Sequence, residues 1–291
     1  MQLLQGKQLA EILLKQLKEK ISALEVKPRL AIIQIGDEIP SNVYVALKEK
    51  TGKEIGIDID TYKYQTGDFS FVRSKISELN IDKTIHGIII QLPTPGTEIT
   101  PLLDIVTPEK DVDGLTSKNL GLIWHNKLTE IMGATPKAIL FALSYIAEKS
   151  GNSLKEFLTG KNVLIINHNI LIGKPLAGRL LNLDATVTLA HSKTKNINSL
   201  LENSDIIITA TGNRIINQEN SDRLKQDVII IDSGYSIIDG VVRGDVDPDS
   251  VKEKASWLTP VPGGIGPLGV AMLMQNTYES CINSQSQHLL P

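Results

Sequence analysis

The amino-acid sequence predicts an α/β protein with two domains, each built around a mainly parallel sheet. Short apolar runs of strand length alternate with segments whose apolar residues recur at helical spacing. The chain has 291 residues, more than one domain usually contains. The alternation stops at a connecting stretch and then starts again, so we expect a second α/β series after about residue 135.

The first series is predicted to contain three helices and three strands. Helices are expected over 7–24, 41–55 and 69–79, and strands over 30–36, 58–64 and 86–93. Ser41 is placed to act as the N-cap of the second helix. Because strands and helices alternate, this part should form a mainly parallel sheet.

The second series has the doubly wound pattern of a Rossmann-like domain. Helices are expected over 136–149, 174–183, 197–202 and about 270–283, and strands over 162–166, 185–190, 205–209 and 227–232. The polar stretch 213–226 is interpreted as a surface connection. We place one domain at 1–135 together with a returning C-terminal helix within 268–291, and the Rossmann-like domain at 136–267.

Composition argues against several classes of protein. The net charge is −3, so no basic excess indicates a nucleic-acid partner. A single cysteine, Cys281, excludes an internal disulfide and suits a reducing compartment such as the cytoplasm. The five histidines lack paired spacing with other metal ligands, so no metal site is expected. No signal peptide is expected at the N-terminus, and the apolar runs are too short for a membrane span.

Three polar side chains, from two segments, lie where a parallel sheet would bind a ligand. Tyr44 and Lys48 share a helix face because they are four residues apart, and a phenol beside a lysine suits proton transfer. Gln91 ends a buried strand, where its amide could orient water or bond a lysine. On spacing alone, a solvated lysine beside a half-buried tyrosine, and a glutamine that solvates its own turn, are the favoured interpretations.

The segment Lys110-Asp111-Val112-Asp113-Gly114 places two carboxylates and a glycine in a loop. Such a loop can bind a cation, cap a helix or grip the amino-amide edge of a ring such as a pterin. Taken alone, it is best interpreted as a turn and cap.

A dinucleotide site is indicated weakly by the first strand-to-helix turn of the second series. Asn167 to Pro175 occupies this turn, but of the usual three glycines only Gly173 is present. The next strand ends at His191-Ser192-Lys193-Thr194. It carries no acidic residue for a ribose hydroxyl, and Ser192 and Lys193 suit a 2′-phosphate instead. A polar loop is an equally good interpretation.

The stretch Thr259-Pro260-Val261-Pro262-Gly263-Gly264-Ile265-Gly266-Pro267 contains three glycines and three prolines. Proline fixes the backbone and glycine leaves it uncovered, so a flat ligand could approach the main chain closely. The alternative is a rigid connector between domains.

Together and in this order, these segments resemble the methylenetetrahydrofolate dehydrogenase/methenyltetrahydrofolate cyclohydrolase family. The resemblance extends from Gly6 to about Thr277. Its most specific elements are Tyr44-Val45-Ala46-Leu47-Lys48, Gln91-Leu92-Pro93, Lys110 to Gly114 and Pro260 to Pro267.

The resemblance implies a two-domain enzyme with the folate in a cleft between the domains. The first domain would carry the catalytic residues Lys48, Tyr44, Gln91 and Asp113, with Gln91 bonded to the lysine and Asp113 on the pterin edge. It further implies folate contacts at Tyr44, Val45, Ala46, Leu47, Lys48, Ile90, Gln91, Leu92, Asp113, Pro262, Gly263, Gly264, Ile265 and Gly266. NADP would be bound by Asn167, His168, Asn169, Gly173, Ser192 and Tyr235. A cytoplasmic homodimer that handles tetrahydrofolate derivatives for purine biosynthesis, without nucleic acid, membrane or metal, completes the expectation.

The chain departs from the family mainly on the cofactor side. Asn167-His168-Asn169 stands where the family has Gly-Arg-Ser, so the expected arginine partner of the 2′-phosphate is replaced by histidine. An NAD-dependent enzyme is therefore an alternative. Ala134 to Ala138 and Ser233 also differ from the family pattern. Gly269 replaces a threonine that could cap the last helix, and glycine is a serviceable cap.

The expected function is oxidation of 5,10-methylenetetrahydrofolate with NADP, followed by hydrolysis of the methenyl product to 10-formyltetrahydrofolate. Three alternatives stay open from the sequence. They are a cyclohydrolase with weakened or NAD-shifted dehydrogenase activity, a non-catalytic folate-binding module, and an unrelated dehydrogenase on the same fold.

Overall fold

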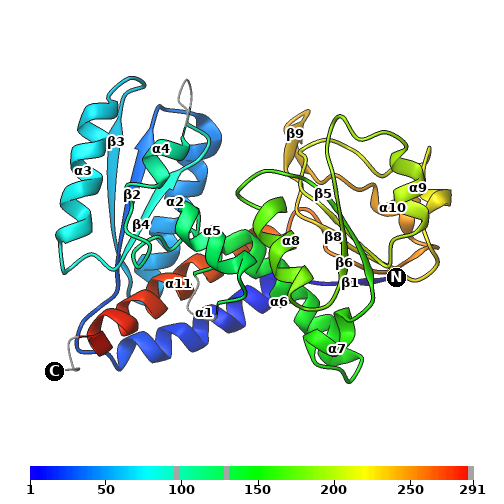
Figure 1. Cartoon of the computed structure of the whole chain (residues 1–291), viewed down its shortest axis with the longest axis horizontal. Helices are drawn as coiled ribbons and strands as arrows, with labels where there is room; N and C mark the ends of the chain where they lie inside the picture. The colour runs from blue at the N-terminus through cyan, green and yellow to red at the C-terminus, as the bar shows by residue number, and fades with distance from the viewer. Residues whose placement is uncertain (95–98, 128–130, 288–291) are drawn as a thin grey trace. The chain divides into compact units, whose positions relative to one another are not determined.

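The computed structural model describes residues 1–94, 99–127 and 131–287 (Figure 1). The chain forms two compact units, each with a parallel sheet, as the α/β prediction requires. We name them by these sheets: the small-sheet unit comprises residues 11–134 and 270–291, and the large-sheet unit comprises residues 1–10 and 135–269. The functional domain boundaries expected from the sequence stay a prediction.

The small-sheet unit is organised by three parallel strands in the order β3 (Asp58–Tyr64), β2 (Arg29–Ile35), β4 (Gly87–Gln91). Strand β2 is buried from Leu30 to Ile35, which explains why all of these residues except Gln34 are apolar. The accompanying helices are α1 (Gly6–Ser22), α2 (Ile39–Ile55), α3 (Phe69–Ile81), α4 (Thr100–Leu103), α5 (Ser117–Trp124) and α11 (Ile265–Gln287). Because the strand order reverses between β2 and β4, their carboxyl ends mark the position where such sheets bind ligands.

Helix α11 closes the small-sheet unit late in the sequence. The Asn276 side chain donates hydrogen bonds to the backbone oxygens of Val112 and Met132, both at 2.8 Å. The Ser280 hydroxyl lies 2.5 Å from the backbone oxygen of His86. Buried carbonyl groups of the early chain therefore find their partners on the last helix.

The large-sheet unit contains a six-stranded, all-parallel sheet. Its order is β1 (Gln2–Leu3), β11 (Ala255–Leu258), β8 (Val228–Asp232), β7 (Ile206–Thr209), β5 (Asn162–Ile166), β6 (Thr186–Ala190). The helices are α6 (Ala134–Lys149), α7 (Leu154–Leu158), α8 (Gly173–Leu181), α9 (Ile197–Glu202) and α10 (Pro248–Val251), with a 3₁₀ turn, η1, at Ser221–Arg223. An antiparallel hairpin joins β9 (Ser236–Ile238) to β10 (Val241–Arg243). The order reverses between β5 and β7, as in doubly wound folds.

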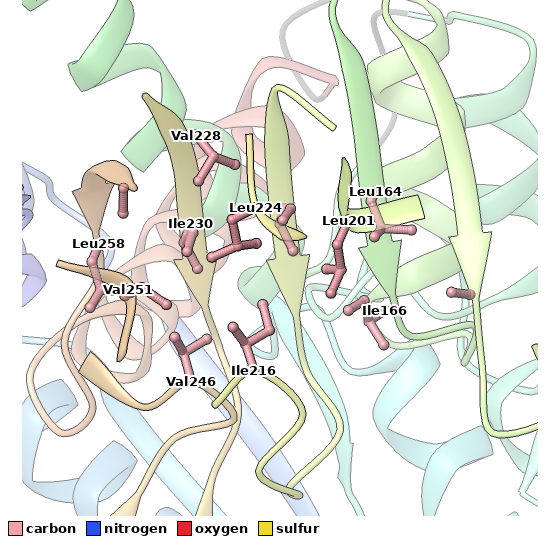
Figure 2. Close-up of a cluster of buried hydrophobic side chains, with 13 residues drawn as sticks. Leu164, Ile166, Leu201, Ile216, Leu224, Val228, Ile230, Val246, Val251 and Leu258 are labelled. Atoms are coloured by element: carbon pink, nitrogen blue, oxygen red, sulfur yellow. The ribbon is translucent and has the colours of Figure 1, made fainter. Parts of the chain in front are cut away.

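One face of the large sheet is covered by a continuous apolar cluster (Figure 2). Strand residues such as Leu164 and Ile230 meet side chains from α9, α10 and the connections between elements. Ile216 and Leu224 belong to this cluster and are fully or nearly fully buried. The interpretation of 213–226 as a surface connection is therefore wrong in part, because two apolar anchors hold it against the sheet.

Two predicted helix boundaries are also wrong. Helix α2 begins at Ile39 after Glu38, so Ser41 is inside its first turn and does not cap it; its hydroxyl is buried. Helix α11 begins at Ile265, because proline at position 267 is tolerated in a first turn. Gly269 is consequently an interior residue of α11 and not a cap.

Within the described residues, none of the helices combines the length and the apolar character that a bilayer span requires. The same part of the chain contains no cluster of three or more histidine, cysteine or acidic side chains suited to holding a metal ion.

Candidate active site

Lys48 and Gln91, two of the predicted catalytic residues, meet where β2 and β4 end. Helix α2 follows β2 and carries Lys48, whose Nζ donates a hydrogen bond of 2.8 Å to Oε1 of Gln91, the last residue of β4. The Gln91 Nε2 group donates to the backbone oxygen of Leu92 at 2.7 Å. Since the Gln91 amide is held at both ends, its oxygen is fixed toward the lysine.

Burial shifts the pKa values of Lys48 and Asp113 toward their neutral forms. Desolvation lowers the pKa of Lys48, and the charge of Asp113 opposes that shift only in part. Desolvation likewise raises the pKa of Asp113; Lys48 and a backbone hydrogen bond from Ala134 counteract it, and Asp111 adds to it. The pair therefore holds a lysine that releases its proton more readily than an exposed lysine does.

The other charged residues of the 110–114 segment have structural roles. Asp111 is buried and accepts hydrogen bonds from the backbone nitrogens of Leu115 and Thr116 at 3.1 and 2.8 Å. Lys110 Nζ donates to the backbone oxygens of Leu79 and Asp82, at the end of α3. The turn-and-cap interpretation thus holds for Lys110 and Asp111. Of the three charged residues, Asp113 is the one that is coupled to Lys48.

The remaining predicted folate residues differ in exposure. Tyr44 is half-buried, one helical turn before Lys48 on α2. Ala46 and Leu47 are exposed, and Leu92 is half-buried. Val45 and Ile90 are core side chains, 3% and 2% exposed, so only their backbone could contact a ligand.

Sequence reasoning missed a second polar pair beside this site. Gln34 lies opposite Gln91 across β2 and β4 and is 1% exposed. Its Nε2 donates to Oδ1 of Asn42 at 2.6 Å, while its Oε1 has no hydrogen-bond partner among the described residues. A glutamine within the apolar run 30–35 was the available signal.

The predicted dinucleotide turn is stabilised by its own asparagines. Asn167 Oδ1 accepts from the backbone nitrogens of Asn169 and Gly173 at 2.9 and 3.1 Å, and Asn169 Oδ1 accepts from Ile172. Asn167 Nδ2 donates to the backbone oxygen of Ala210 at 2.6 Å, which joins the turns after β5 and β7. These contacts place Asn167 at the point where the strand order reverses.

Glycine is required at position 173 by close packing. A Cβ atom there would lie 2.2 Å from the backbone oxygen of Asn167. His168, Asn169 and Ser192 are exposed beyond the ends of β5 and β6, and Tyr235 is 41% exposed in the turn after β8. The chain thus offers exposed polar groups at the carboxyl edge of a doubly wound sheet, which suits a dinucleotide.

Two buried aspartates tie three loops together at this edge. Asp232 accepts from the backbone nitrogens of Gly234, Asp245 and Val246 at 2.8, 3.1 and 2.9 Å. Asp245 Oδ2 accepts from the backbone nitrogen of Thr211 at 2.6 Å. Burial raises the pKa of Asp232 to about 6. The sequence did not predict this network.

The glycine- and proline-rich loop packs against the start of α1 within the large-sheet unit. Lys7 donates from its backbone nitrogen to the backbone oxygen of Gly263 at 2.8 Å. A Cβ atom on Gly6 would lie 2.0 Å from the Gly264 oxygen. Pro262 and Gly266 are exposed, Gly263 is half-buried, and Gly264 and Ile265 are buried. The glycines permit this close approach of two backbone segments.

Comparisons with known proteins agree on one family. Residues 4–113 match the model of the tetrahydrofolate dehydrogenase/cyclohydrolase catalytic domain, and residues 134–285 match its NAD(P)-binding domain. The bifunctional protein FolD of Lactobacillus acidophilus is 40% identical over 279 residues, 94% of each chain. That of Caldanaerobacter subterraneus is 35% identical and covers 96% of each chain.

Solved structures give the same result. The bifunctional FolD of Campylobacter jejuni has a TM-score of 0.90 and 34% identity, and the match covers 97% of this chain and 99% of that one. The dehydrogenase-cyclohydrolase of Trypanosoma brucei, solved with NADP and an inhibitor, has a TM-score of 0.88 and 28% identity, with 98% of each chain covered.

Proposed function

The chain belongs to the tetrahydrofolate dehydrogenase/cyclohydrolase family, and we propose that it oxidises 5,10-methylenetetrahydrofolate with NADP and then hydrolyses the methenyl product to 10-formyltetrahydrofolate. The observation that carries this proposal is the hydrogen bond between Lys48 and Gln91, beside Asp113, at the carboxyl ends of β2 and β4. It places an amine with a lowered pKa where an α/β sheet binds its ligand.

In the oxidation step the substrate's bridging carbon loses a hydride and becomes cationic. The bound nicotinamide supplies the hydride acceptor. A charged ammonium beside the developing cation would oppose this step, so the lowered pKa of Lys48 favours it. Asp113 is proposed to accept hydrogen bonds from the amino-amide edge of the pterin and so to fix the ring beside the amine.

In the hydrolysis step Lys48 acts first as a general base and then as a general acid. Neutral Nζ accepts a proton as water adds to the methenyl carbon. The bond from that carbon to N5 then breaks, N5 takes a proton from Lys48, and the formyl group stays on N10. One further proton is released to solvent. Gln91 Oε1 holds the amine in place, and Tyr44, on the same helix face, is proposed to share its hydrogen bonds.

The cofactor is proposed to lie along the turns that follow β5, β6 and β8. Gly173 permits close approach of the backbone, and Asn167, Asn169 and Tyr235 would line the site. No acidic side chain follows β6, where an enzyme that uses NAD grips the ribose hydroxyl. We therefore propose NADP as the preferred cofactor, with His168 and Ser192 facing the 2′-phosphate. No metal is invoked.

Folate contacts are proposed for the residues that flank the amine and for the glycine-rich loop. Exposed Ala46 and Leu47 and half-buried Leu92 would offer side chains, and Val45 and Ile90 only backbone. Pro262, Gly263, Gly264, Ile265 and Gly266 stay proposed contacts of the substrate's ring and tail.

The decisive experiment replaces Lys48 by Met and, separately, by Arg, with Lys50→Met on the exposed side of α2 as control. Methionine removes the amine, and arginine keeps a charge that is not lost near neutral pH. Both changes should lower hydrolysis of methenyltetrahydrofolate by about 100-fold or more, the usual contribution of a proton-transfer group. Normal hydrolysis by Lys48→Arg would show that no neutral amine is needed.

We further propose a cytoplasmic homodimer that supplies formyl groups for purine biosynthesis. The exposed apolar residues of the β9–β10 hairpin, Ile237, Ile238 and Val241, give a surface that a second copy could cover. Light scattering at micromolar concentration should give twice the chain mass of 31.8 kDa. A monomer mass would refute the dimer and leave the catalytic proposal intact.

A further inference from the structure

A second carboxamide lies beside Gln91 on the face of the small sheet that carries the candidate site. Gln34 and Gln91 are register partners on the parallel strands β2 and β4, so their side chains point to the same face and their backbones lie about 4.8 Å apart. Both side chains bond to α2, Gln34 to Asn42 and Gln91 to Lys48. The two amides therefore form one polar layer between α2 and the carboxyl ends of the strands.

The direction of the Gln34 amide is set by a chain of hydrogen bonds that begins at the surface. The carboxylate of exposed Asp37 can only accept, and it accepts from Asn42 Nδ2 at 2.8 Å. The Asn42 Oδ1 atom is thereby turned toward Gln34 and accepts from its Nε2 at 2.6 Å. The Oε1 atom of Gln34 must then face away from Asn42, as an acceptor.

Two buried oxygens at this end of α2 lack a hydrogen-bond partner among the described residues. They are Gln34 Oε1 and Ser41 Oγ, on side chains of residues that are 1% and 3% exposed. Buried polar groups that the protein leaves unpaired are the usual ligands of internal waters, and such a water typically makes about three hydrogen bonds. A water held by these two oxygens would therefore take a third partner.

The amine of Lys48 is directed toward the same place. Ser41 and Lys48 are seven residues apart on α2, about two helical turns, and so lie on one face of the helix. Long side chains on a helix point back toward its N-terminus, so Lys48 Nζ extends toward the turn that contains Ser41. The remaining separation is about one turn, or about 5 Å, which a water spans with two hydrogen bonds of about 2.8 Å each.

We propose that Gln34 Oε1 and Ser41 Oγ hold a water that accepts a hydrogen bond from Lys48 in its charged form, so that Gln34 is a positioning residue for proton transfer. The inference rests on the proposed hydrolysis, in which Lys48 is charged between its two proton transfers. An ammonium has three donors, and Gln91 Oε1 accepts from one of them. The water accepts from a second and donates to Gln34 and Ser41, and it takes no part in bond making.

Few charges act on this amine. Desolvation lowers the pKa of Lys48 and the charge of Asp113 raises it. Tyr44 is the titratable residue between Ser41 and Lys48 on this helix face, and β2 and β4 present uncharged amides. An acceptor for the ammonium favours the charged form and so raises the pKa of Lys48. Its removal should therefore lower that pKa further.

The experiment follows two quantities of the full chain across pH. One is the rate of methenyltetrahydrofolate hydrolysis, and the other is the acetylation of Lys48 by acetic anhydride in competition with a free amine, located by mass spectrometry. Because the neutral amine is the nucleophile, acetylation reports the Lys48 pKa without the enzymatic reaction. Gln34→Leu should shift the midpoint of each profile by about one unit to lower pH and reduce the maximal hydrolysis rate about tenfold, the effect of one hydrogen bond to a charge.

Two further variants separate this effect from a loss of structure. Gln34→Glu keeps an accepting oxygen, so neither midpoint should move to lower pH. Asn80→Leu removes an amide of the same unit that bonds the backbone of Ile105 and Thr107, and it should leave both midpoints in place. An unchanged acetylation midpoint in Gln34→Leu, or an equal fall in Gln34→Glu, would overturn the proposal.

Ser41→Ala tests whether the two oxygens share one water. Alone it should shift both midpoints in the same direction as Gln34→Leu but by less. Combined with Gln34→Leu it should add nothing, because both changes remove the same water. Additive shifts, or no shift in Ser41→Ala, would overturn the shared water, and this variant decides the question if Gln34→Leu does not fold. A wild type without hydrolysis would instead refute the proposed function, while the acetylation midpoints would still show whether Gln34 acts on the amine.

Discussion

Asp113 is the residue that sets how far the pKa of Lys48 falls. Its negative charge raises that pKa, in opposition to desolvation. Asp113→Asn removes the charge, so the Lys48 pKa should fall further and the neutral amine should persist at lower pH. We expect the acid limb of kcat/KM for hydrolysis to shift to lower pH, with a lower maximum because the pterin loses an acceptor.

Rates of methenyltetrahydrofolate hydrolysis across pH test this, with Asp58→Asn, at the exposed first residue of β3, as the matched control. A shift of the acid limb to higher pH, or no shift, would mean that Asp113 does not act on the amine.

At the residue scale, the sequence predicted the members of the candidate site better than their individual roles. Their spacing predicted that Tyr44 and Lys48 share one helix face. Gln91 was expected nearby because it ends a parallel strand, where such sheets bind ligands. The loop charges could not be assigned, because Asp111 and Asp113 are two residues apart and only the fold decides which caps a helix. Gln34 escaped notice because a single polar residue does not disturb the apolar pattern of β2.

At the element scale, the start of α11 gives a stability prediction. Because Gly269 is interior to the helix, alanine should raise the unfolding free energy by about 0.5–1 kcal/mol. An added Cβ meets only Thr135 Oγ1, at an ordinary 3.7 Å. Urea unfolding in a Trp124→Phe background, where Trp257 of β11 reports on the large-sheet unit, measures the change. A loss of stability would argue that Gly269 needs a backbone conformation that alanine resists.

At Gly234, beside the buried pair Asp232 and Asp245, alanine is expected to lower the stability and not to raise it. An added Cβ would lie 2.0 Å from Oδ1 of buried Asp245, so the side chain or the loop must move. Gly234→Ala should lower the unfolding free energy of the large-sheet unit by about 1–3 kcal/mol, the usual cost of overpacking. Gly266→Ala, where a Cβ meets open space in the same unit, is the control. Equal stability of the two variants would show that the loop yields freely.

Elements with strong periodicity were predicted, as was the short helix α9, but several of the shortest elements were not. The alternation in 58–64 and the apolar runs of β2, β4 and β5 are long enough to identify a strand. Strand β1 has two residues and exists only through its pairing with β11, which no local pattern reveals. The β9–β10 hairpin is similarly short. The predicted start of α11 was too late because Pro267, a residue type that usually ends helices, is accommodated in the first turn of this one.

At the scale of the whole molecule, Asp232 should make stability depend on pH. Its pKa is about 6 in the folded protein against an ordinary 3.8. The native state binds this proton more tightly, so the stabilisation is complete below pH 3.8 and is lost as pH rises to about 6. Between about pH 4 and pH 7 the loss should be about 2 kcal/mol.

Asp232→Asn should remove this part of the pH dependence, whatever its effect on absolute stability. The Trp257 signal in urea isolates the large-sheet unit, as above. His86, in the small-sheet unit, acts in the other direction: burial lowers its pKa, so stability is lost as pH falls below its ordinary 6.5. Parallel pH profiles of wild type and variant would contradict the role of Asp232.

Because α11 follows residues 11–134 in the sequence but packs in the same unit, the small-sheet unit cannot complete its folding until α11 has been synthesised. Asn276 and Ser280 supply donors to carbonyl groups that were synthesised 144 to 194 residues earlier. These carbonyl groups are therefore bonded to water, and not to their final donors, until residues 276 and 280 have been synthesised. Synthesis of α11, rather than emergence of residues 11–134, is the event that completes the small-sheet unit around Lys48.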